Sequence, residues 1–140
     1  MSDRMRIAYI AGPITDDPKY EGKFNAAADL LMLRGYAVVN PVKRCAGLVN
    51  DGWNRGEIMA YCFEAVIGSD CLMLLPGWEN SQGTKAELQV FLKTHKVSDF
   101  VVCKIVDGLI YKVPLCELNN IEVIDSPDLK YAKHLLNIAD

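Results

Sequence analysis

The fold of this chain is decided by residues 71–95, which read CLMLLPGWENSQGTKAELQVFLKTH. Residues 71–75 are an uninterrupted apolar run, which is typical of a strand buried on both faces of a parallel sheet. Residues 76–82 are rich in turn-forming residue types, so we expect a loop there and a helix over 83–95. A buried strand, a loop and a helix in this order are the building unit of an α/β fold.

The same alternation of strand and helix extends towards both ends of the chain. We expect further strands at residues 7–11, 36–39, 100–106, 109–113 and 121–124. We expect further helices over 19–34 and 55–67, and a C-terminal helix capped by Ser126 with Pro127 in its first position. Asp107-Gly108 is typical of a tight hairpin turn. The pattern predicts a mostly parallel sheet that helices cover on both faces.

Length and composition favour a single domain over residues 1–140. The chain has 140 residues, of which 51% are hydrophobic and 24% charged, as is ordinary for a globular domain with one core. Its net charge of -3 provides no basic surplus, so we do not expect a nucleic-acid polymer as partner. A small anion could still bind to a few backbone N–H groups.

The cysteines and histidines indicate a reduced protein without a metal site. The five cysteines are widely spaced and lack the close pairs of a zinc or redox motif. His95 and His134 have no second ligand at suitable spacing, so we expect no metal. Residues 1–6 lead into an apolar run too short for a signal peptide or a membrane span. We therefore expect a cytoplasmic protein with no membrane partner.

Three loops are expected at the carboxyl ends of the parallel strands, where ligands of such sheets bind. They contain Gly12-Pro13-Ile14-Thr15, Asn40-Pro41 and the segment 76–83. These loops are rich in polar residues and in residues with special backbone conformations. The alternative interpretation is that Gly12-Pro13 is only a turn and that Asn40-Pro41 only ends a strand.

The motif Ser81-x-Gly83-x-x-x-Glu87 is the strongest candidate site. It follows the buried strand and begins a helix, so its N–H groups point to the space above the sheet, where they suit a phosphate or a sugar hydroxyl. Glu87 shares a helix face with Val90 and Phe91, and we expect it to point inwards. A carboxylate directed into a crevice is a candidate nucleophile or acid/base group. The alternative is that Glu87 only complements the helix dipole.

Several segments carry a resemblance to a known superfamily. They are YIAGPIT at 9–15, FNAAA at 24–28 with Leu31, GYAVVNP at 35–41 and DCLMLLPGWENSQGTKAE at 70–87. In order and spacing they resemble a family of small phage and bacterial proteins. That family is similar to nucleoside 2-deoxyribosyltransferases and to 2'-deoxynucleoside 5'-phosphate N-hydrolases. The segment from about residue 104 onward carries no recognised motif.

The resemblance implies a flavodoxin-like three-layer α/β sandwich, with a mostly parallel sheet of about five strands and an extra C-terminal hairpin. It also implies that Glu87 attacks the anomeric carbon of a nucleoside or nucleotide, and that water or an incoming base resolves the glycosyl-enzyme. Ser81 and Gly83 would hold the 5'-hydroxyl or 5'-phosphate. The base and sugar would be framed by Ala11, Gly12, Pro13, Asn40 and Pro41, with Trp53 or Trp78 stacked on the base. Related proteins commonly form homo-oligomers.

Cys62 is a departure from the pattern of the active relatives. Those proteins carry an aspartate that contacts the leaving base, eight residues before the position of Asp70. A thiol is a poor substitute for a carboxyl in protonating a base. Cys62 also shares an apolar helix face with Ile58 and Ala65, which favours a packing role.

Two functional hypotheses therefore stay open. The first is an N-glycoside hydrolase or deoxyribosyltransferase that acts through Glu87, without a cofactor. The second is a nucleotide-binding protein that sequesters or senses its ligand with little or no turnover. Flavin binding is disfavoured, because Gly12-Pro13-Ile14-Thr15 lacks the run of hydroxyl-bearing and small residues that would wrap a flavin phosphate.

Overall fold

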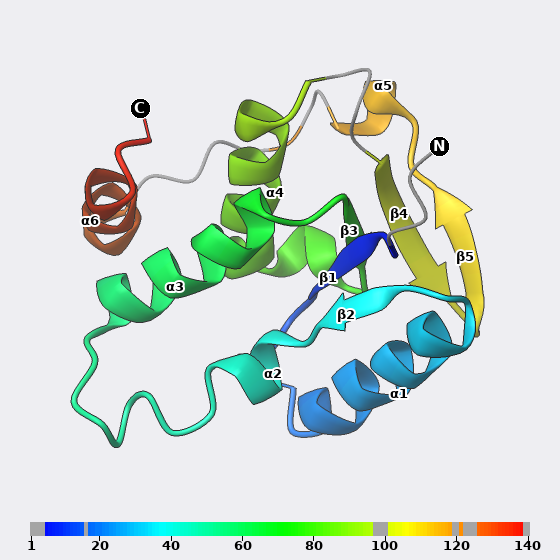
Figure 1. The fold of residues 1–140 in the computed structure, drawn as a ribbon, viewed down its shortest axis with the longest axis horizontal. Coiled ribbons are helices and arrows are strands. Elements are labelled where there is room, and N and C mark those ends of the chain that lie inside the picture. Colours follow the sequence, from blue (N-terminus) through cyan, green and yellow to red (C-terminus); the bar gives the residue numbers. More distant parts are fainter. Residues whose placement is uncertain (1–4, 16, 97–100, 119–120, 122–125, 139–140) are drawn as a thin grey trace.

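The computed structural model describes residues 5–15, 17–96, 101–118, 121 and 126–138. Its centre is a five-stranded sheet in the order β2-β1-β3-β4-β5 (Figure 1). The strands are β1 (Ile7–Ala11), β2 (Ala37–Val39), β3 (Cys71–Leu74), β4 (Val101–Val106) and β5 (Leu109–Lys112). The first four strands are parallel, and β5 runs antiparallel to β4. This strand order is that of the flavodoxin-like fold.

The order of the strands reverses between β1 and β3. From β1 the chain passes outward to β2 and then returns to β3 on the other side of β1. The pairing continues beyond the strand ends, where the N–H of Leu75 donates to the carbonyl of Ala11 at 2.9 Å. The carboxyl ends of β1 and β3 therefore form the switch point, which is where open α/β sheets bind ligands.

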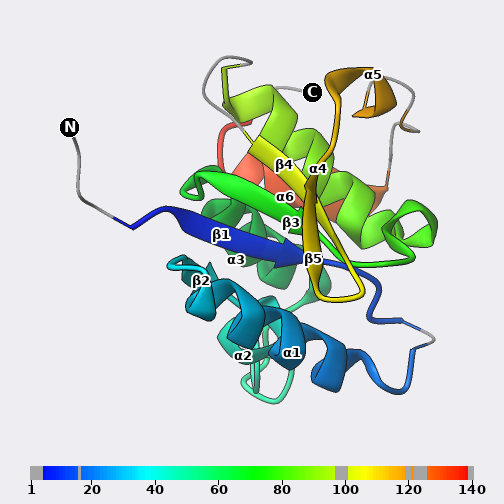
Figure 2. The same cartoon turned by 90° about the vertical axis from the view of Figure 1, so that its right-hand side faces the viewer.

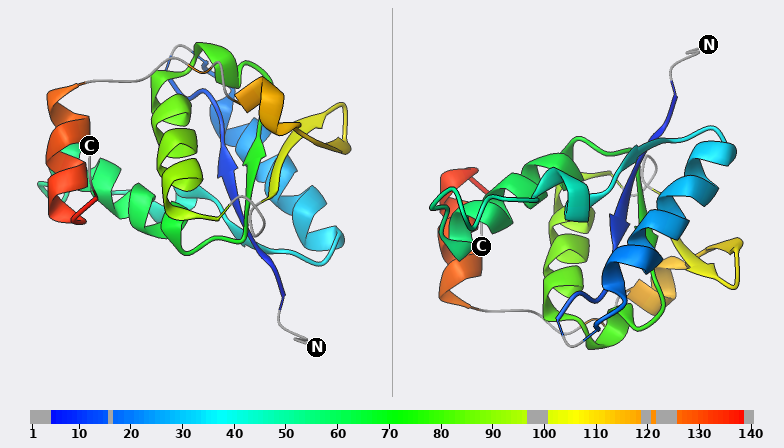
Figure 3. Two further views of the ribbon diagram at one scale, coloured as in Figure 1. Left: turned by 90° about the horizontal axis from the view of Figure 1, so that it is seen from above. Right: turned by 90° about the horizontal axis from the view of Figure 1, so that it is seen from below.

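Helices cover both faces of the sheet, which explains why β1 and β3 are almost entirely apolar and buried. On one face lies α1 (Tyr20–Leu33), and on the other lie α3 (Arg55–Ile67) and α4 (Gln82–Thr94), with the sheet between them (Figure 2). Helix α6 (Pro127–Leu135) packs on the outer side of α3, away from the sheet (Figure 3). The remaining helical segments are α2 (Pro41–Arg44), η1 (Trp78–Asn80) and α5 (Leu115–Leu118).

Most of the expected elements are confirmed, including the hairpin and the C-terminal helix. Asp107 and Gly108 both have positive φ, 52° and 77°, as a two-residue turn with the right-handed twist of its strands requires. Ser126 caps α6 by accepting a hydrogen bond from the N–H of Leu129 at 3.2 Å. The strand expected at 121–124 falls mostly outside the described residues. No helix in the described ranges has the length and apolar character needed to cross a membrane.

Helix α2 was not expected from the sequence, which placed Asn40-Pro41 in a loop at the end of a strand. Asn40 caps this helix, because its side-chain oxygen accepts a hydrogen bond from the N–H of Val42 at 3.1 Å. Pro41 occupies the first turn, where its missing N–H is not needed. The segment is thus a helix start rather than only the end of a strand.

Candidate active site

Tyr9 and Glu87 meet beneath the switch point of the sheet. Tyr9 lies in β1 with its side chain on the face covered by α3 and α4, and none of it is exposed. Glu87 lies in the second turn of α4, and its Oε2 accepts a hydrogen bond from the Tyr9 hydroxyl. The inward orientation expected for Glu87 is therefore found in the structure.

Burial dominates the electrostatics of this pair. Residue Glu87 keeps a partly exposed surface, but its carboxyl group is surrounded by protein and has lost its hydration. Burial raises the pKa of Glu87 to about 8, although the hydrogen bond from Tyr9 opposes this shift. Burial and the neighbouring Glu87 carboxylate also raise the pKa of Tyr9 well above its usual value. Glu87 is thus a carboxyl whose proton is lost only near or above neutral pH, as is common for groups in active sites.

Two cysteines stand beside the Tyr9–Glu87 pair. Cys62, on α3, lies within hydrogen-bond reach of the Tyr9 hydroxyl and close enough to Glu87 for their charges to interact. The Sγ atoms of Cys62 and Cys45 are 3.1 Å apart. Cys45 is the residue that ends α2. The cluster of Tyr9, Glu87, Cys62 and Cys45 therefore joins β1, α4, α3 and the end of α2.

The two thiols have opposite pKa shifts because they share one hydrogen bond. The hydrogen bond from Cys62 lowers the pKa of Cys45 to about 7, against the effect of burial, and the nearby Arg44 cation acts in the same direction. The pKa of Cys62 is raised strongly, first by that same hydrogen bond, then by burial and by the charge of Glu87. Cys45 is therefore the thiol of the pair that ionises first, and once it is ionised Cys62 is the donor.

Next to the cysteines, Arg44 and Trp53 both contact the ring of Tyr61, which lies on α3. The guanidinium carbon of Arg44 lies 3.8 Å above the ring centroid of Tyr61, within the range of a cation–π contact. Arg44 Nη2 also donates to the Tyr61 carbonyl at 3.4 Å. Trp53, which is 39% exposed, meets the Tyr61 ring edge-on with centroids 5.5 Å apart. Trp53 therefore has a structural contact as well as a free surface.

The loops after β1 and β3 touch each other at the switch point. A Cβ atom at Gly12 would lie 2.8 Å from the Cβ of Leu75, so only glycine fits there. Gly77 has a φ of 86°, and a Cβ atom on it would lie 3.3 Å from the Cγ of Pro13. Ala11 is fully buried at the end of β1. These contacts give Gly12 a role in packing the two loops together.

Asn40 connects α1 with the start of α2. It is only 8% exposed, and its Nδ2 donates to Asn25 Oδ1 at 3.1 Å. Because Asn40 and Pro41 begin α2, they also set the position of Cys45 at the end of that helix.

Ser81 caps α4, and Gly83 leaves space beside the start of the same helix. The Oγ of Ser81 accepts a hydrogen bond from the N–H of Thr84 at 3.2 Å and lies 3.0 Å from Thr84 Oγ1. A Cβ atom at Gly83 would meet nothing within 4 Å. Gly83 is thus exposed in the first turn of α4, while the Ser81 hydroxyl is already engaged in the cap.

Residues 6–98 match the model of a family described as a domain of unknown function, DUF4406. The chain belongs to the DUF4406 family. No curated protein and no solved structure matches the chain. The matched region of the DUF4406 domain runs from just before β1 to just beyond α4. It therefore contains the whole cluster of Tyr9, Glu87, Cys62 and Cys45.

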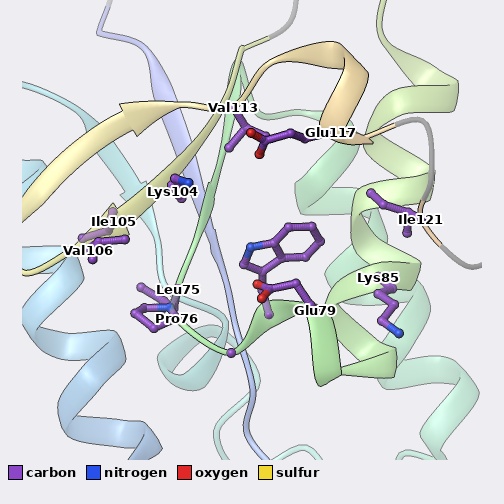
Figure 4. A pocket seen from close by; sticks show the side chains of 12 residues that line it. Leu75, Pro76, Glu79, Lys85, Lys104, Ile105, Val106, Val113, Glu117 and Ile121 are labelled. Carbon is purple, nitrogen blue, oxygen red and sulfur yellow. The ribbon is translucent and has the colours of Figure 1, made fainter.

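A pocket of about 680 Å³ lies elsewhere, at the carboxyl ends of β3 and β4. Lys104 and Lys85 lie on opposite sides of it, with Glu79 and Glu117 also facing the space (Figure 4). Of the residues that the sequence predicted for the site, this pocket includes Trp78 and not Glu87. Part of its lining comes from residues beyond the DUF4406 match. We therefore place the candidate active site at the Glu87 cluster rather than in this pocket.

The structure brings together some of the predicted residues and separates others. Glu87 and Cys62 share one cluster. Trp53 instead contacts Tyr61, and Trp78 lines the pocket at β3 and β4. Sequence reasoning missed Tyr9, Cys45 and Arg44. A signal existed for Tyr9, since a hydroxyl within a buried aliphatic strand needs a hydrogen-bond partner.

Proposed function

We propose that this DUF4406 domain cleaves the N-glycosidic bond of a nucleoside or deoxynucleotide, with Glu87 as the nucleophile. The observation that carries the proposal is the position of Glu87, hydrogen-bonded to Tyr9 next to the switch point of the sheet. Burial of the Glu87 carboxyl adds support, because a desolvated carboxylate is a stronger nucleophile than a hydrated one. With a pKa of about 8, Glu87 is ionised mainly at alkaline pH, so the rate of base release should rise with pH through that value.

In the proposed reaction the ionised Glu87 attacks the anomeric carbon as the bond to the base nitrogen breaks. The base leaves with the bonding electron pair and takes up a proton from water. Water then attacks the same carbon, releases the sugar and restores the Glu87 carboxylate, so the configuration is retained. The Tyr9 hydroxyl holds the oxygen of Glu87 that it contacts and so orients the other oxygen towards the sugar. The exposed first turn of α4 at Gly83 would take the 5'-hydroxyl or 5'-phosphate.

The alternative function, nucleotide binding without turnover, is favoured by one observation at Cys62. Its thiol is hydrogen-bonded to Cys45 and has a raised pKa, so it is a poor acid for a departing base. If the leaving base needs a protein acid, this chain binds the nucleotide and releases no product.

A base-release assay with a matched control distinguishes the two functions. The protein is incubated with deoxynucleosides, deoxynucleoside monophosphates and NAD, and free base is separated by chromatography. We expect release by the natural chain and its loss in Glu87→Gln. Glu64→Gln, which changes an exposed glutamate on α3, should leave release unaffected. Release that persists in Glu87→Gln contradicts the nucleophile, and tight binding with no release favours the binding function.

Cys62→Asp tests the leaving-group step directly. A carboxyl at this position would supply the acid that active relatives are expected to carry, so turnover should rise. An unchanged rate, with binding preserved, would show that departure of the base does not limit the reaction.

The remaining parts of the proposal concern the location, the oligomeric state and the partners of the protein. We propose a cytoplasmic homo-oligomer that takes a small-molecule nucleoside or nucleotide, needs no cofactor and does not bind nucleic-acid polymers. Light scattering coupled to size-exclusion chromatography measures the oligomeric state, and a monomer at all concentrations would contradict that part.

A further inference from the structure

The contact between Cys45 and Cys62 differs from the surroundings of the other cysteines. Their Sγ atoms are 3.1 Å apart although the residues are 17 positions apart and belong to different elements. Cys71 and Cys103 are buried in the sheet, and Cys116 is exposed on α5. A disulfide has an S–S length of about 2.05 Å, so the pair needs to approach by only about 1 Å.

We propose that Cys45 and Cys62 form a reversible disulfide beside Glu87 when the protein meets a low-molecular-weight disulfide such as oxidised glutathione. The cluster assigns a different role to each thiol. Cys45 is partly exposed at the end of α2 and carries the Arg44 cation next to it, so it is the sulfur that an external disulfide reaches. Cys62 faces inward towards Tyr9 and Glu87, so it is the resolving thiol.

The reaction takes two thiol–disulfide exchange steps. The Cys45 thiolate attacks one sulfur of oxidised glutathione, the S–S bond breaks, and glutathione leaves as a thiolate that takes a proton from water. Cys62 then loses its proton to water and attacks Cys45 Sγ, which expels the second glutathione thiolate. Two protein thiols are oxidised, and one glutathione disulfide is reduced to two thiols. Reduced glutathione reverses both steps.

The geometry favours the second step once the first has occurred. The main cause of the raised pKa of Cys62 is its hydrogen bond to Cys45. In the mixed disulfide Cys45 has lost its negative charge, so it no longer raises the pKa of Cys62 in this way. The attacking sulfur is already in contact with its target. The mixed disulfide should therefore be short-lived.

The disulfide would change the surroundings of Glu87 and fasten the end of α2 to α3. Cys62 would lose the hydrogen through which it donates, and the Cys45 charge that raises the pKa of Glu87 would be removed. The proposal does not depend on whether Glu87 turns over a nucleoside, because disulfide formation is read from mass alone.

Mass spectrometry of the full chain tests the proposal. The reduced protein is equilibrated in glutathione buffers of increasing oxidised fraction, free thiols are blocked by alkylation, and intact mass and peptides are analysed. We expect a form lighter by two hydrogens, without bound glutathione, in which the Cys45 and Cys62 peptides are linked. A stable glutathione adduct on Cys45, no reaction at either thiol, or a linkage to another cysteine would overturn the proposal.

Serine variants test the order of the steps. Cys62→Ser should accumulate the mixed disulfide on Cys45, whereas Cys45→Ser should leave Cys62 largely unmodified. Cys116→Ser is the matched control and should form the disulfide as the natural chain does. Faster modification of Cys62 than of Cys45 would contradict the assignment of roles. If a variant does not fold, the order is read from a time course of peptide masses in the natural chain.

Discussion

Replacing Glu87 by glutamine should remove a pH dependence of stability that the natural chain has. The pKa of Glu87 is about 8 in the folded protein, whereas an unfolded chain has a value near that of a free glutamate, 4.5. Between these two pH values the unfolded chain has lost a proton that the folded protein keeps. The free energy of unfolding therefore falls by about 1.4 kcal/mol per pH unit as the pH rises through this window.

The full window corresponds to a loss of at most roughly 5 kcal/mol. Glutamine is neutral, has the same shape and can still accept the hydrogen bond from Tyr9. We thus expect the two proteins to be similarly stable near about pH 4, and Glu87→Gln to be the more stable above about pH 8.

Urea unfolding at pH steps across the window measures the difference between the two proteins. Cys45 has a pKa of about 7 and titrates in the same range, so the comparison is repeated in a Cys45→Ser background. Glu64→Gln, at an exposed position, should show no such trend. If the free energies of unfolding of Glu87→Gln and the natural chain differ by a constant amount, or by an amount that shrinks as the pH rises, the raised pKa of Glu87 is refuted.

Further predictions concern the contacts around the site and the caps. Tyr9→Phe removes the hydrogen bond that lowers the pKa of Glu87. Because base release requires the ionised Glu87, the pH at which the rate of release rises should increase by about 1 unit, measured as a pH–rate profile. Asn54→Ala removes the side-chain hydrogen bond of the α3 capping box, in which Asn54 Oδ1 accepts from the N–H of Glu57 at 2.8 Å, and should lower the free energy of unfolding by about 1 kcal/mol. Gly12→Ala introduces a Cβ atom 2.8 Å from that of Leu75 and should destabilise by about 1–3 kcal/mol in urea unfolding. An unshifted profile for the first, or unchanged stability for the other two, would contradict the respective contact.

The fold was predictable because its determinants are local in sequence. The apolar run that became β3, the cap at Ser126 and the Asp107-Gly108 turn each identify their element from a few neighbouring residues. Helix α2 escaped prediction because it has four residues, too few to show a periodic pattern, and depends on the cap at Asn40.

The candidate site was predictable only in part, because its contacts join distant segments. The inward direction of Glu87 follows from its spacing to apolar residues on the same helix. Its partner Tyr9 is 78 positions away, and their contact depends on the strand order and on how α4 lies on the sheet. Likewise, the approach of Cys45 to Cys62 depends on α2, which no pattern indicated.

The position of β3 in the sheet makes it depend on a strand outside the matched region. β3 pairs with β1 on one side and with β4 on the other, and β4 lies beyond the region that matches the DUF4406 model. A β3 without its outer neighbour would expose four apolar residues and a row of unpaired backbone groups, which invites aggregation. The strand that β3 needs on this side is therefore supplied by a part of the chain outside the DUF4406 match.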